Sequence, residues 1–480
     1  MKRYLLLLLF PFQAFAQNTS LYFQESFGTA GIDISRSVKQ LSSGSIYILG
    51  NSTTGNIGNN DISLTKSDKY GNVQWTEYYG TQNVENGYYL NLTSDGNLLF
   101  VAESETSFND LDILIYKVDT SGNVIWNKVF ATSVNESPSY VEQTIDGGFI
   151  ITGFQNDTFG FNNALVLKLD ASGNYQWDKS VGGTRNDIGD MVHQISNGNY
   201  ILTGDSQSWS ITGDYDVEVY ELDSAGNVNW QNNFGDTLTN GCKGLLVTTD
   251  NNYVSFGEGQ IYTNSPFDFI IQKIDSNGTL VWRHNYGGLY ADAAFSGIET
   301  PDGGFVFTGY SNSYNGGGPI DLVVFKIDSS GTFLWKNTYG SPGIDIGYEI
   351  IKSTVCSGYV LTGYTTDSIN NTTNYYLLQL TDSATISGVN ETIKSDSFVF
   401  DVYPNPASFF ISINYDLFSI YSNTKVVLYN LLGQEIDSVN INDKKGRALI
   451  NVTNLNSGLY FCKLLRNGEV FSSKKVILTR

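Results

Sequence analysis

The sequence contains few of the residues that build disulfide scaffolds and metal sites. Its 480 residues include 3 Cys and 2 His. Cys242, Cys356 and Cys462 are odd in number and far apart, so they do not form a disulfide framework. So few thiols and imidazoles give little basis for a zinc site or a Cys/His catalytic pair. The sequence therefore predicts a fold stabilised by packing, with no cofactor, and leaves open whether a cation is bound.

Charged residues are also scarce, at 16%, and they are unbalanced in sign. Asp and Glu number 48 against 27 Lys and Arg, for a net charge of −21. Such a chain repels nucleic acid and anionic lipid head groups, which excludes nucleic acid as a partner. The aromatic content of 14% excludes a disordered chain.

No apolar run reaches the ~18–20 residues that a membrane-spanning helix needs. The apolar run at 5–12 follows Lys2 and Arg3 and precedes Ala14-Phe15-Ala16, which has the small-x-small pattern of a cleavage site. This pattern predicts a signal peptide over residues 1–16 and a mature chain that begins at Gln17. The protein is therefore expected outside the cytoplasm.

The middle of the chain is a repeat array. Six of the seven tryptophans follow one another at steps of 51, 51, 53, 52 and 53 residues, each with Asp seven and Gly four residues before it: Trp75, Trp126, Trp177, Trp230, Trp282 and Trp335. This period is close to the ~50 residues of some propeller blades. In the sixth repeat, strand patterns cover 295–300, 304–309, 321–328 and 332–339. Four antiparallel strands per repeat is the pattern of a propeller blade.

The number of blades follows from a small residue that ends the second strand of every repeat. It recurs seven times, as Gly50, Ala102, Gly153, Gly204, Gly257, Gly309 and Gly363. The seventh repeat lacks a tryptophan strand after Leu380, while residues 21–28 match residues 75–80 with Phe23 in the tryptophan position. We therefore predict an all-β fold, with a seven-bladed β-propeller over 17–385 whose N-terminal strand completes the last blade and leaves no open edge.

The repeat consensus, in residues 326–335 (KIDSSGTFLW) and 358–364 (GYVLTGY), resembles the bacterial seven-bladed propeller repeats of the SBBP type. The resemblance covers about three quarters of the chain and implies a bacterial surface protein. It does not indicate a ligand, because one fold supports many functions.

The C-terminal segment differs in charge and pattern. Residues 398–480 contain 9 Lys and Arg against 6 Asp and Glu, or +3, in contrast to the acidic repeats. A polar stretch over residues 386–397 predicts a linker. Apolar and polar residues alternate from Ile411 to Tyr415, and Gly458 supplies a turn before further strand residues. The pattern predicts a small antiparallel β-sandwich over 398–480.

Four motifs in this segment resemble the type A C-terminal sorting domain of the type IX secretion system. They lie at 402–407, 428–434, 455–460 and 474–476, and their key residues are Tyr403, Pro404, Asn405, Pro406, Gly433, Gly458 and Tyr460. The resemblance implies a Bacteroidota-type bacterium, export across the outer membrane and the type IX secretion machinery as a partner. It also implies removal of the domain, followed by release or by attachment at the outer-membrane surface.

Two rings of polar residues are candidates for ligand binding on the face with the longer loops. The first ring precedes the inner strands and includes Asp33, Glu85, Glu136, Asp187, Asn240, Asp292 and Asp345. The second opens the third strands, at Asp61, Asp112, Asn163, Asp216, Asp268, Asp321 and Asn374. Such rings can bind a cation or sugar hydroxyls. The alternative is that each side chain caps a turn by accepting backbone N–H groups.

Aromatic residues that break the repeat are further candidates. Trp209 is placed in the loop 206–210, and comparable loops are expected to hold Tyr262, Tyr290, Tyr310 and Tyr314. Exposed aromatic rings beside Asn and Asp suit carbohydrate, since sugar C–H faces stack on rings. The alternative is that these rings seal neighbouring loops.

No catalytic motif is found, and His193 and His284 are expected to be structural. The sequence therefore favours a non-enzymatic propeller that binds an extracellular ligand, possible ligands including glycan. Two alternatives stay open: a polysaccharide-acting enzyme with acids at the channel mouth, and a structural or adhesive surface protein with a protein partner.

Overall fold

The computed structural model describes residues 17–55, 57–107, 110–263, 265–314, 319–367, 372–384, 399–403, 407, 409–416, 424–430, 433–441, 443, 445–466 and 469–478. The predicted signal peptide (1–16) and linker (386–397) lie outside these residues. The chain divides into a larger unit over residues 18–383 and a smaller unit that contains residues 384–480. Both units are made of strands, and no helix occurs among the described residues, so the all-β prediction is confirmed.

The larger unit contains seven four-stranded antiparallel sheets in chain order. Sheet 1 contains β2 (Asp33–Gln40), β3 (Ile46–Ser52), β4 (Asp61–Ser67) and β5 (Val73–Tyr79). Sheet 2 contains β6 (Val84–Leu92), β7 (Leu98–Ser107), β8 (Asp110–Val118) and β9 (Val124–Phe130). Sheet 3 contains β10 (Glu136–Gln143), β11 (Phe149–Asn156), β12 (Asn162–Leu169) and β13 (Tyr175–Val181). Sheet 4 contains β14 (Asp187–Gln194), β15 (Tyr200–Ser206), β16 (Asp216–Leu222) and β17 (Val228–Asn233).

The remaining sheets continue the pattern. Sheet 5 contains β18 (Asn240–Val247), β19 (Tyr253–Gln260), β20 (Phe267–Ile274) and β21 (Leu280–Tyr286). Sheet 6 contains β22 (Asp292–Glu299), β23 (Phe305–Ser311), β24 (Asp321–Ile327) and β25 (Phe333–Tyr339). Sheet 7 contains β26 (Asp345–Lys352), β27 (Gly358–Asp367), β28 (Thr372–Ala384) and, from the other end of the chain, β1 (Gln17–Phe27).

Burial differs between the strands of a sheet in the way that the sequence pattern requires. The second strand of sheet 1 is buried at every position, whereas the fourth strand is mostly exposed or half-buried. Continuous apolar runs such as residues 46–49 suit a strand covered on both faces, and the mixed outer strands suit a surface. Each sheet therefore packs its middle strands against its neighbours.

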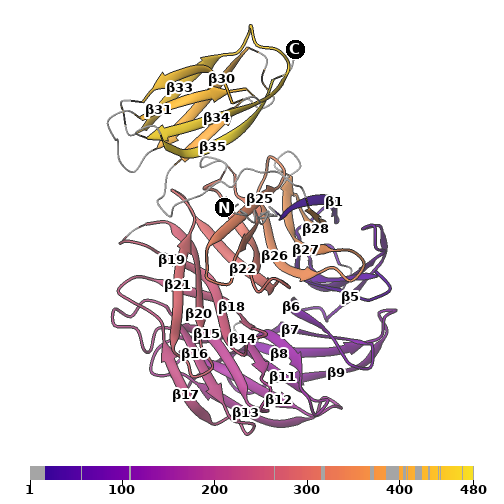
Figure 1. The fold of residues 1–480 in the computed structure, drawn as a ribbon. Coiled ribbons are helices and arrows are strands. Elements are labelled where there is room, and N and C mark those ends of the chain that lie inside the picture. The colour runs from indigo at the N-terminus through magenta and orange to yellow at the C-terminus, as the bar shows by residue number, and fades with distance from the viewer. Residues whose placement is uncertain are drawn as a thin grey trace, which may run out of the picture. The chain divides into compact units, whose positions relative to one another are not determined.

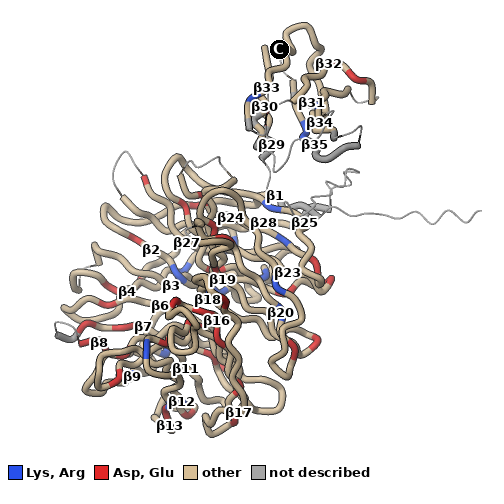
Figure 2. Tube along the Cα trace, turned by 90° about the vertical axis from the view of Figure 1, so that its left-hand side faces the viewer, with Lys and Arg blue, Asp and Glu red and all other residues tan. Residues whose placement is uncertain are grey.

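Neighbouring sheets contact one another through their first strands. These contacts join β2 to β6, β6 to β10, β10 to β14, β14 to β18, β18 to β22 and β22 to β26, and β2 also contacts β26 and β27. Figure 1 shows the sheets of the larger unit arranged like the blades of a propeller, with the first strands toward the centre. Acidic residues are spread over these sheets and exceed the basic ones (Figure 2).

The N-terminal strand lies where the sequence places it, beside β28. Phe23 and Phe27 pack against a cluster of buried residues from sheets 1 and 7, which includes Val38, Ile46 and Val360. The first and last sheets thus share a hydrophobic core, although more than 300 residues separate Val38 from Val360 in the chain.

The repeated tryptophans pack against the following sheet. A Cβ added to Gly226 would lie 2.7 Å from a ring carbon of Trp177, and the equivalent distances are 2.8 Å for Gly173 with Trp126 and 2.9 Å for Gly278 with Trp230. At Gly71 in sheet 1, the ring of Phe23 occupies the same place, at 2.8 Å. Phe23 therefore substitutes for a tryptophan, as the sequence alignment of the repeats predicts.

Gly226→Ala should destabilise the larger unit. Gly226 has φ +81°, which L-residues rarely adopt, and a methyl group would collide with Trp177. We expect a loss of about 1–3 kcal/mol in unfolding free energy, measured by chemical denaturation. Gly198→Ala is the matched control, because Gly198 has φ +87° but no atom lies within 4 Å of an added Cβ. Equal losses in the two variants would contradict the packing role of Trp177.

The smaller unit contains two sheets. One has the order β29 (Val399–Tyr403), β30 (Phe410–Asp416), β33 (Lys445–Asn451). The other has the order β32 (Glu435–Asn440), β31 (Thr424–Tyr429), β34 (Gly458–Arg466), β35 (Glu469–Leu478). One cluster of buried residues draws from both sheets, including Ile411, Ile450, Val426, Leu464 and Val476.

Candidate functional site

Every inner strand of the larger unit has a β-bulge at the same place. The bulge inserts one residue that has no partner in the second strand, three positions after the first-ring residue that opens the inner strand. The seven bulged residues are Arg36, Tyr88, Ser139, Asp190, Lys243, Phe295 and Tyr348. All are half-buried. The most irregular residues of the repeat thus lie on the innermost strands.

The bulged residues of sheets 6, 7, 1 and 2 form an aromatic arc of three rings, Phe295, Tyr348 and Tyr88, that includes Arg36. The Arg36 guanidinium carbon lies 5.3 Å from the centroid of the Tyr88 ring and 5.4 Å from that of Tyr348. Tyr348 stacks on Phe295, with ring centroids 5.3 Å apart. Phe295 and Tyr348 also contact Tyr310 and Tyr364 of the second strands. Side chains from sheets 6, 7, 1 and 2 meet here.

Sheets 4 and 5 contribute a charged group instead. Lys243 Nζ lies 4.0 Å from Asp205 and 3.5 Å from Glu258. Burial raises the pKa of Asp205 to about 6, although Lys243 and the Cys242 N–H oppose the rise. Burial and the charge of Asp205 raise the pKa of Asp190 well above its usual value. Asp190 and Asp205 therefore titrate as a coupled pair, at a higher pH than isolated carboxyls do.

A second polar group lies further along the inner strands. Lys39 Nζ forms an ion pair with Glu349 Oε1 at 2.6 Å and lies 4.5 Å from the centroid of the Tyr89 ring. Glu349 also accepts the Ser37 hydroxyl and the Val38 N–H. The charges of both Lys39 and Glu349 are thus satisfied within the fold.

His193 continues this group on sheet 4. Its Nδ1 lies 2.5 Å from Glu142 Oε2, and its Nε2 lies 3.0 Å from the Leu245 carbonyl oxygen. Burial lowers the pKa of His193, but the Glu142 charge and both hydrogen bonds outweigh burial, so the net pKa is raised. With both ring nitrogens bound inside the fold, His193 has the structural role that the sequence suggests.

The first-ring acids point into their own loops. Each accepts a hydrogen bond from the backbone N–H four residues earlier, and each is at most 1% exposed: Asp33, Glu85, Glu136, Asp187, Asp292 and Asp345. Asn240 differs, since its amide donates to Asp236 and to the Leu238 carbonyl. This geometry is the turn cap that the sequence offers as the alternative to ligand binding.

The two rings meet in pairs across neighbouring sheets. A Cβ added to Gly287 would lie 2.2 Å from Asp268 Oδ1 and 2.7 Å from Asp292 Oδ2, so both carboxyls converge on this glycine. Burial and the charge of Asp292 raise the pKa of Asp268 to about 8, and burial raises that of Asp292 to about 6. One of these acids is therefore protonated at neutral pH.

This pairing predicts stability that falls as pH rises. The folded pKa of Asp268 and Asp292 lies above the unfolded value near 4, so their stabilising protonation is complete below pH 4 and lost through pH 6–8. His193 acts in the same direction, because its folded pKa is also raised. We expect a lower melting temperature at pH 8.5 than at pH 5.5, measured by calorimetry.

Asp268→Asn isolates the contribution of one pair. Asn163 and Asn374 already occupy the equivalent positions in sheets 3 and 7, so the amide fits. We expect this variant to gain on the order of 2–4 kcal/mol at pH 8.5 and little at pH 5. An unchanged pH dependence would contradict the assignment of the titration to this pair.

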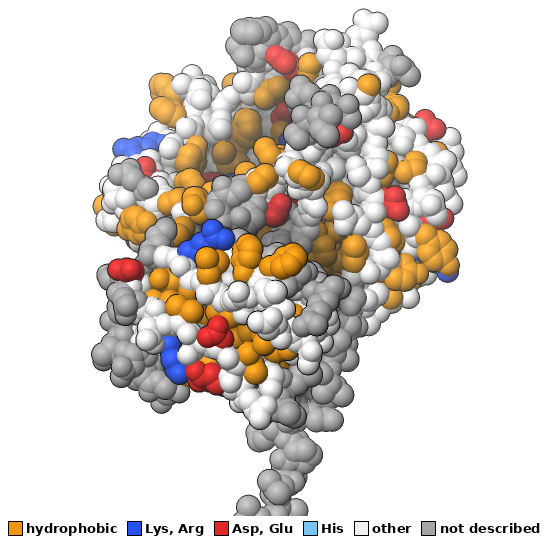
Figure 3. Space-filling model, turned by 90° about the horizontal axis from the view of Figure 1, so that it is seen from above, with side chains coloured by type: hydrophobic (Ala, Val, Ile, Leu, Met, Phe, Trp, Pro, Cys, Tyr) orange, Lys and Arg blue, Asp and Glu red, His pale blue; other side chains and the backbone are white. Residues whose placement is uncertain are grey.

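The predicted aromatic residues fall into two classes. Trp209, Tyr262 and Tyr290 are 46%, 64% and 41% exposed in loops. Tyr314 is half-buried against the sheet 5 and 6 core, with Lys336 over its ring. Tyr310 was expected in a loop but lies in β23, because it pairs with Ala293 and Leu322 in the strand ladders. Figure 3 shows hydrophobic side chains scattered among polar ones, with single acidic and basic side chains between them.

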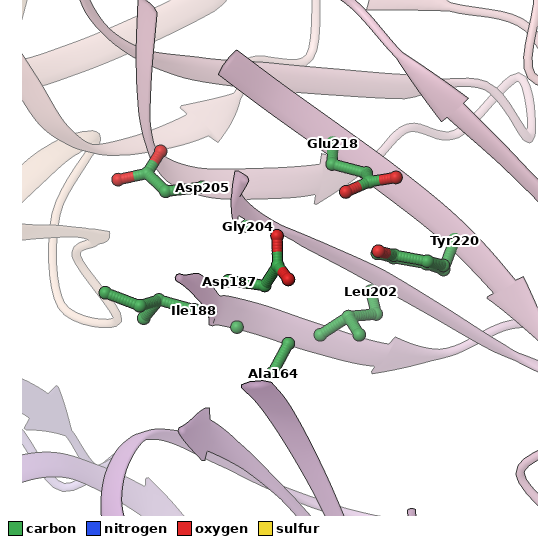
Figure 4. A pocket seen from close by; sticks show the side chains of 9 residues that line it. Ala164, Asp187, Ile188, Leu202, Gly204, Asp205, Glu218 and Tyr220 are labelled. Atoms are coloured by element: carbon green, nitrogen blue, oxygen red, sulfur yellow. The ribbon is translucent and has the colours of Figure 1, made fainter. Parts of the chain in front are cut away.

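A small pocket lies between sheets 3 and 4. Asp187, Asp205, Glu218 and Tyr220 are among its lining residues (Figure 4). Burial raises the pKa of Glu218 to about 7. The pocket is too narrow to hold a water molecule, so these carboxyls do not face a space that could accept a sugar.

Among the residues that the structure describes, no group of three or more His, Cys, Asp or Glu side chains is placed to hold a metal ion. The bulged residues were not predicted as a site. They could have been found by aligning the repeats and comparing the residues three positions after the first ring, where six residue types occur among seven repeats.

The sorting-motif residues are described in part. Pro404, Asn405 and Pro406 lie outside the described residues, and Tyr403 ends β29. Gly433 has φ +76° and opens the chain into β32. Gly458 begins β34, and Tyr460 is 9% exposed and belongs to the core shared by both sheets.

Comparisons with known structures give distant similarities. A protein of unknown function from Dyadobacter fermentans aligns with a TM-score of 0.47 at 11% identity, over 76% of this chain and 99% of that chain. The Pan2 WD40 domain of Neurospora crassa aligns with a TM-score of 0.46 at 11% identity, over 77% and 97%. A fungal alcohol oxidase of the AA5 family aligns with a TM-score of 0.46 at 13% identity, over 97% and 100%. No curated protein matches the chain.

The C-terminal segment has a family match. Residues 401–479 match the secretion system C-terminal sorting domain. No helix in the described residues is long and apolar enough to span a membrane. The chain therefore carries a type IX secretion sorting domain, which follows the propeller-like, all-β unit in the sequence. It is a secreted or cell-surface protein that engages the type IX secretion machinery.

Proposed function

We propose that this protein is a non-enzymatic, closed seven-bladed β-propeller of the SBBP-like type that binds extracellular glycan at the loop end of its inner strands. It would enter the periplasm of a Bacteroidota-type bacterium through the signal peptide at 1–16. The sorting domain, a small β-sandwich, would then direct its export. Its mature form would be released or held at the outer-membrane surface.

Two observations support closure of the ring. The pairing of β1 with β28 joins the two ends of the unit, and β2 contacts β26 and β27. Closure of this kind covers the edges that would otherwise template aggregation. In the smaller unit, the cluster of buried residues that both sheets contribute to supports a β-sandwich.

Ligand binding rests on the row of bulged residues. Positions that build the sheets repeat one residue type, as the tryptophans and their glycines do. The bulged positions instead hold Arg, Tyr, Ser, Asp, Lys, Phe and Tyr in turn, and all are half-buried. An asymmetric set of aromatic and charged groups on a symmetric scaffold is the arrangement that a specific site requires.

The exposed aromatics lie at the same end of the sheets. In sheet 4, Asp187 pairs with Ser206, so the loop after β15 that carries Trp209 lies at the start of β14. The same register holds in sheet 5, where Asn240 pairs with Gly259 before the loop with Tyr262. Aromatic rings near a polar centre suit the C–H faces of sugars.

An enzyme acting on polysaccharide has weaker support. Among the carboxyls with raised pKa, Asp268 and Glu218 are at most 4% exposed, and the half-buried Asp205 lies beside Lys243. General acid catalysis requires that the carboxyl reach the glycosidic oxygen. A binding role needs no such access.

A glycan-array screen of the mature chain from Gln17 to Arg480, with and without calcium, tests the proposal. We expect a restricted set of glycans to bind and Trp209→Ala to weaken that binding, whereas Tyr175→Ala, an exposed aromatic on an outer strand, should not. Absence of binding to every glycan would overturn the proposal. Release of sugar from a bound glycan would favour the enzyme.

A further inference from the structure

Arg36 differs from Lys39 and Lys243, two half-buried basic residues of the inner strands, in lacking an acidic partner. Lys39 pairs with Glu349, and Lys243 with Asp205 and Glu258. Arg36 forms no ion pair or hydrogen bond with any residue that the structure describes, and its Nε is buried without a partner. A buried guanidinium N–H normally has an acceptor, because losing water without replacing it is unfavourable.

Glu103, whose charge acts on Tyr88, and Glu349, which follows Tyr348 in β26, are already bound elsewhere. Glu103 accepts the Asn86 amide and the Ser137 hydroxyl. Glu349 is occupied by Lys39 and the Ser37 hydroxyl. The fold thus provides the arginine with two ring faces, from Tyr88 and Tyr348, but with no anion. The rings hold the guanidinium plane in place and leave its edge as the polar surface.

We propose that Arg36 binds the carboxylate of a uronic-acid-containing glycan. This inference rests on the proposed glycan-binding function and names the class of sugar. A guanidinium edge matches a carboxylate through two parallel N–H···O bonds. The aromatic arc of Phe295 and Tyr348, extended by Tyr310 and Tyr364, offers ring surface next to that edge for the sugar.

The charge of the protein favours a carboxylate over a phosphate. The net charge is −21, and the charge of Glu103 acts on Tyr88, as the charge of Arg36 does. A phosphate dianion would meet about twice the repulsion that a uronate monoanion meets. A single arginine without a lysine beside it therefore suits one negative charge.

The test uses the methyl glycoside of galacturonic acid and its methyl ester with the mature chain in isothermal titration calorimetry. The two compounds share one sugar ring and differ in whether its single carboxyl group is a charged carboxylate or a neutral methyl ester. We expect the acid to bind the wild type more tightly than the ester does. Arg36→Gln should weaken binding of the acid about 10- to 100-fold and leave binding of the ester unchanged. Arg36→Lys should recover only part of the lost affinity for the acid, since lysine keeps the positive charge but lacks the paired N–H donors of the guanidinium.

Arg185→Gln is the matched control. Arg185 is exposed in the loop before β14, at the same end of the sheets, and its removal changes the net charge equally. It should bind the acid as the wild type does. If Arg36→Gln does not fold, as judged by its melting temperature, the comparison of acid with ester in Arg36→Lys decides.

Each contrary outcome has a separate meaning. Equal binding of the acid by wild type and Arg36→Gln would overturn the role of Arg36. If the array shows binding of neutral glycans and none of uronates, the carboxylate inference falls while the glycan-binding function stands. If no glycan binds, both the carboxylate inference and the glycan-binding function are contradicted. Binding of a peptide through its C-terminal carboxylate, lost in Arg36→Gln, would contradict the assignment of a sugar.

Discussion

Deletion of residues 17–28 should lower the melting temperature of the protein by at least about 10 °C, or prevent folding. The deletion removes β1, leaves the β28 edge unpaired and uncovers the core that sheets 1 and 7 share. It also removes the ring of Phe23 from Gly71. Circular dichroism or calorimetry of the chain beginning at residue 29 measures the effect.

Single substitutions separate strand pairing from side-chain packing in this prediction. Phe23→Ala should cost about 2–4 kcal/mol, because its ring packs against the shared core. Tyr22→Ala is the matched control, since Tyr22 is 50% exposed on the same strand. An unchanged melting temperature in the deletion variant would show that β1 does not contribute to sheet 7 in solution and would remove the support for a closed ring.

Removal of residues 398–480 should abolish export while leaving the propeller-like unit folded. Residues 401–479 match the sorting domain, and the larger unit has its own clusters of buried residues. The truncated protein should accumulate in the periplasm, and less than about one tenth of the normal amount should reach the medium or the cell surface. Immunoblots of the cell fractions measure the distribution.

The complementary experiment joins residues 1–16 and 386–480 to a secreted reporter, which should then leave the cell. Within the domain, Gly433→Val is expected to impair export, because φ +76° is unfavourable for a β-branched residue. Phe409→Ser is the control, since Phe409 is 70% exposed. Normal secretion of the truncated protein would contradict the sorting role of this domain.

The sequence was most informative where one requirement recurs in every repeat. The Trp and Gly spacing predicted four strands per repeat, and the alignment of Phe23 with the tryptophans predicted the pairing of β1 with β28. The turn-capping alternative for the first-ring acids also matches the hydrogen bonds observed. Such features are local, or they repeat often enough to be read from spacing.

Features that depend on contacts between sheets could not be read in this way. The bulge that contains Arg36 adds one residue to β2, and neither the apolar pattern nor the repeat length shows it. The lack of an acidic partner for Arg36 depends on side chains from sheets 2 and 7. Tyr310 was expected in a loop because the small residue Gly309 was taken as the end of its strand.

The contact between a tryptophan and the glycine of the next sheet, as between Trp177 and Gly226, has a consequence for the single repeat. Trp177 belongs to sheet 3 and Gly226 to the hairpin between β16 and β17 of sheet 4, so the indole of one repeat packs onto the glycine of the next repeat. One excised repeat would present an unfilled hollow on one flank and an uncovered indole on the other. The two flanks of one repeat are therefore complementary to each other. A chain can lengthen by duplicating such repeats because each new repeat packs against its neighbour through the same interface.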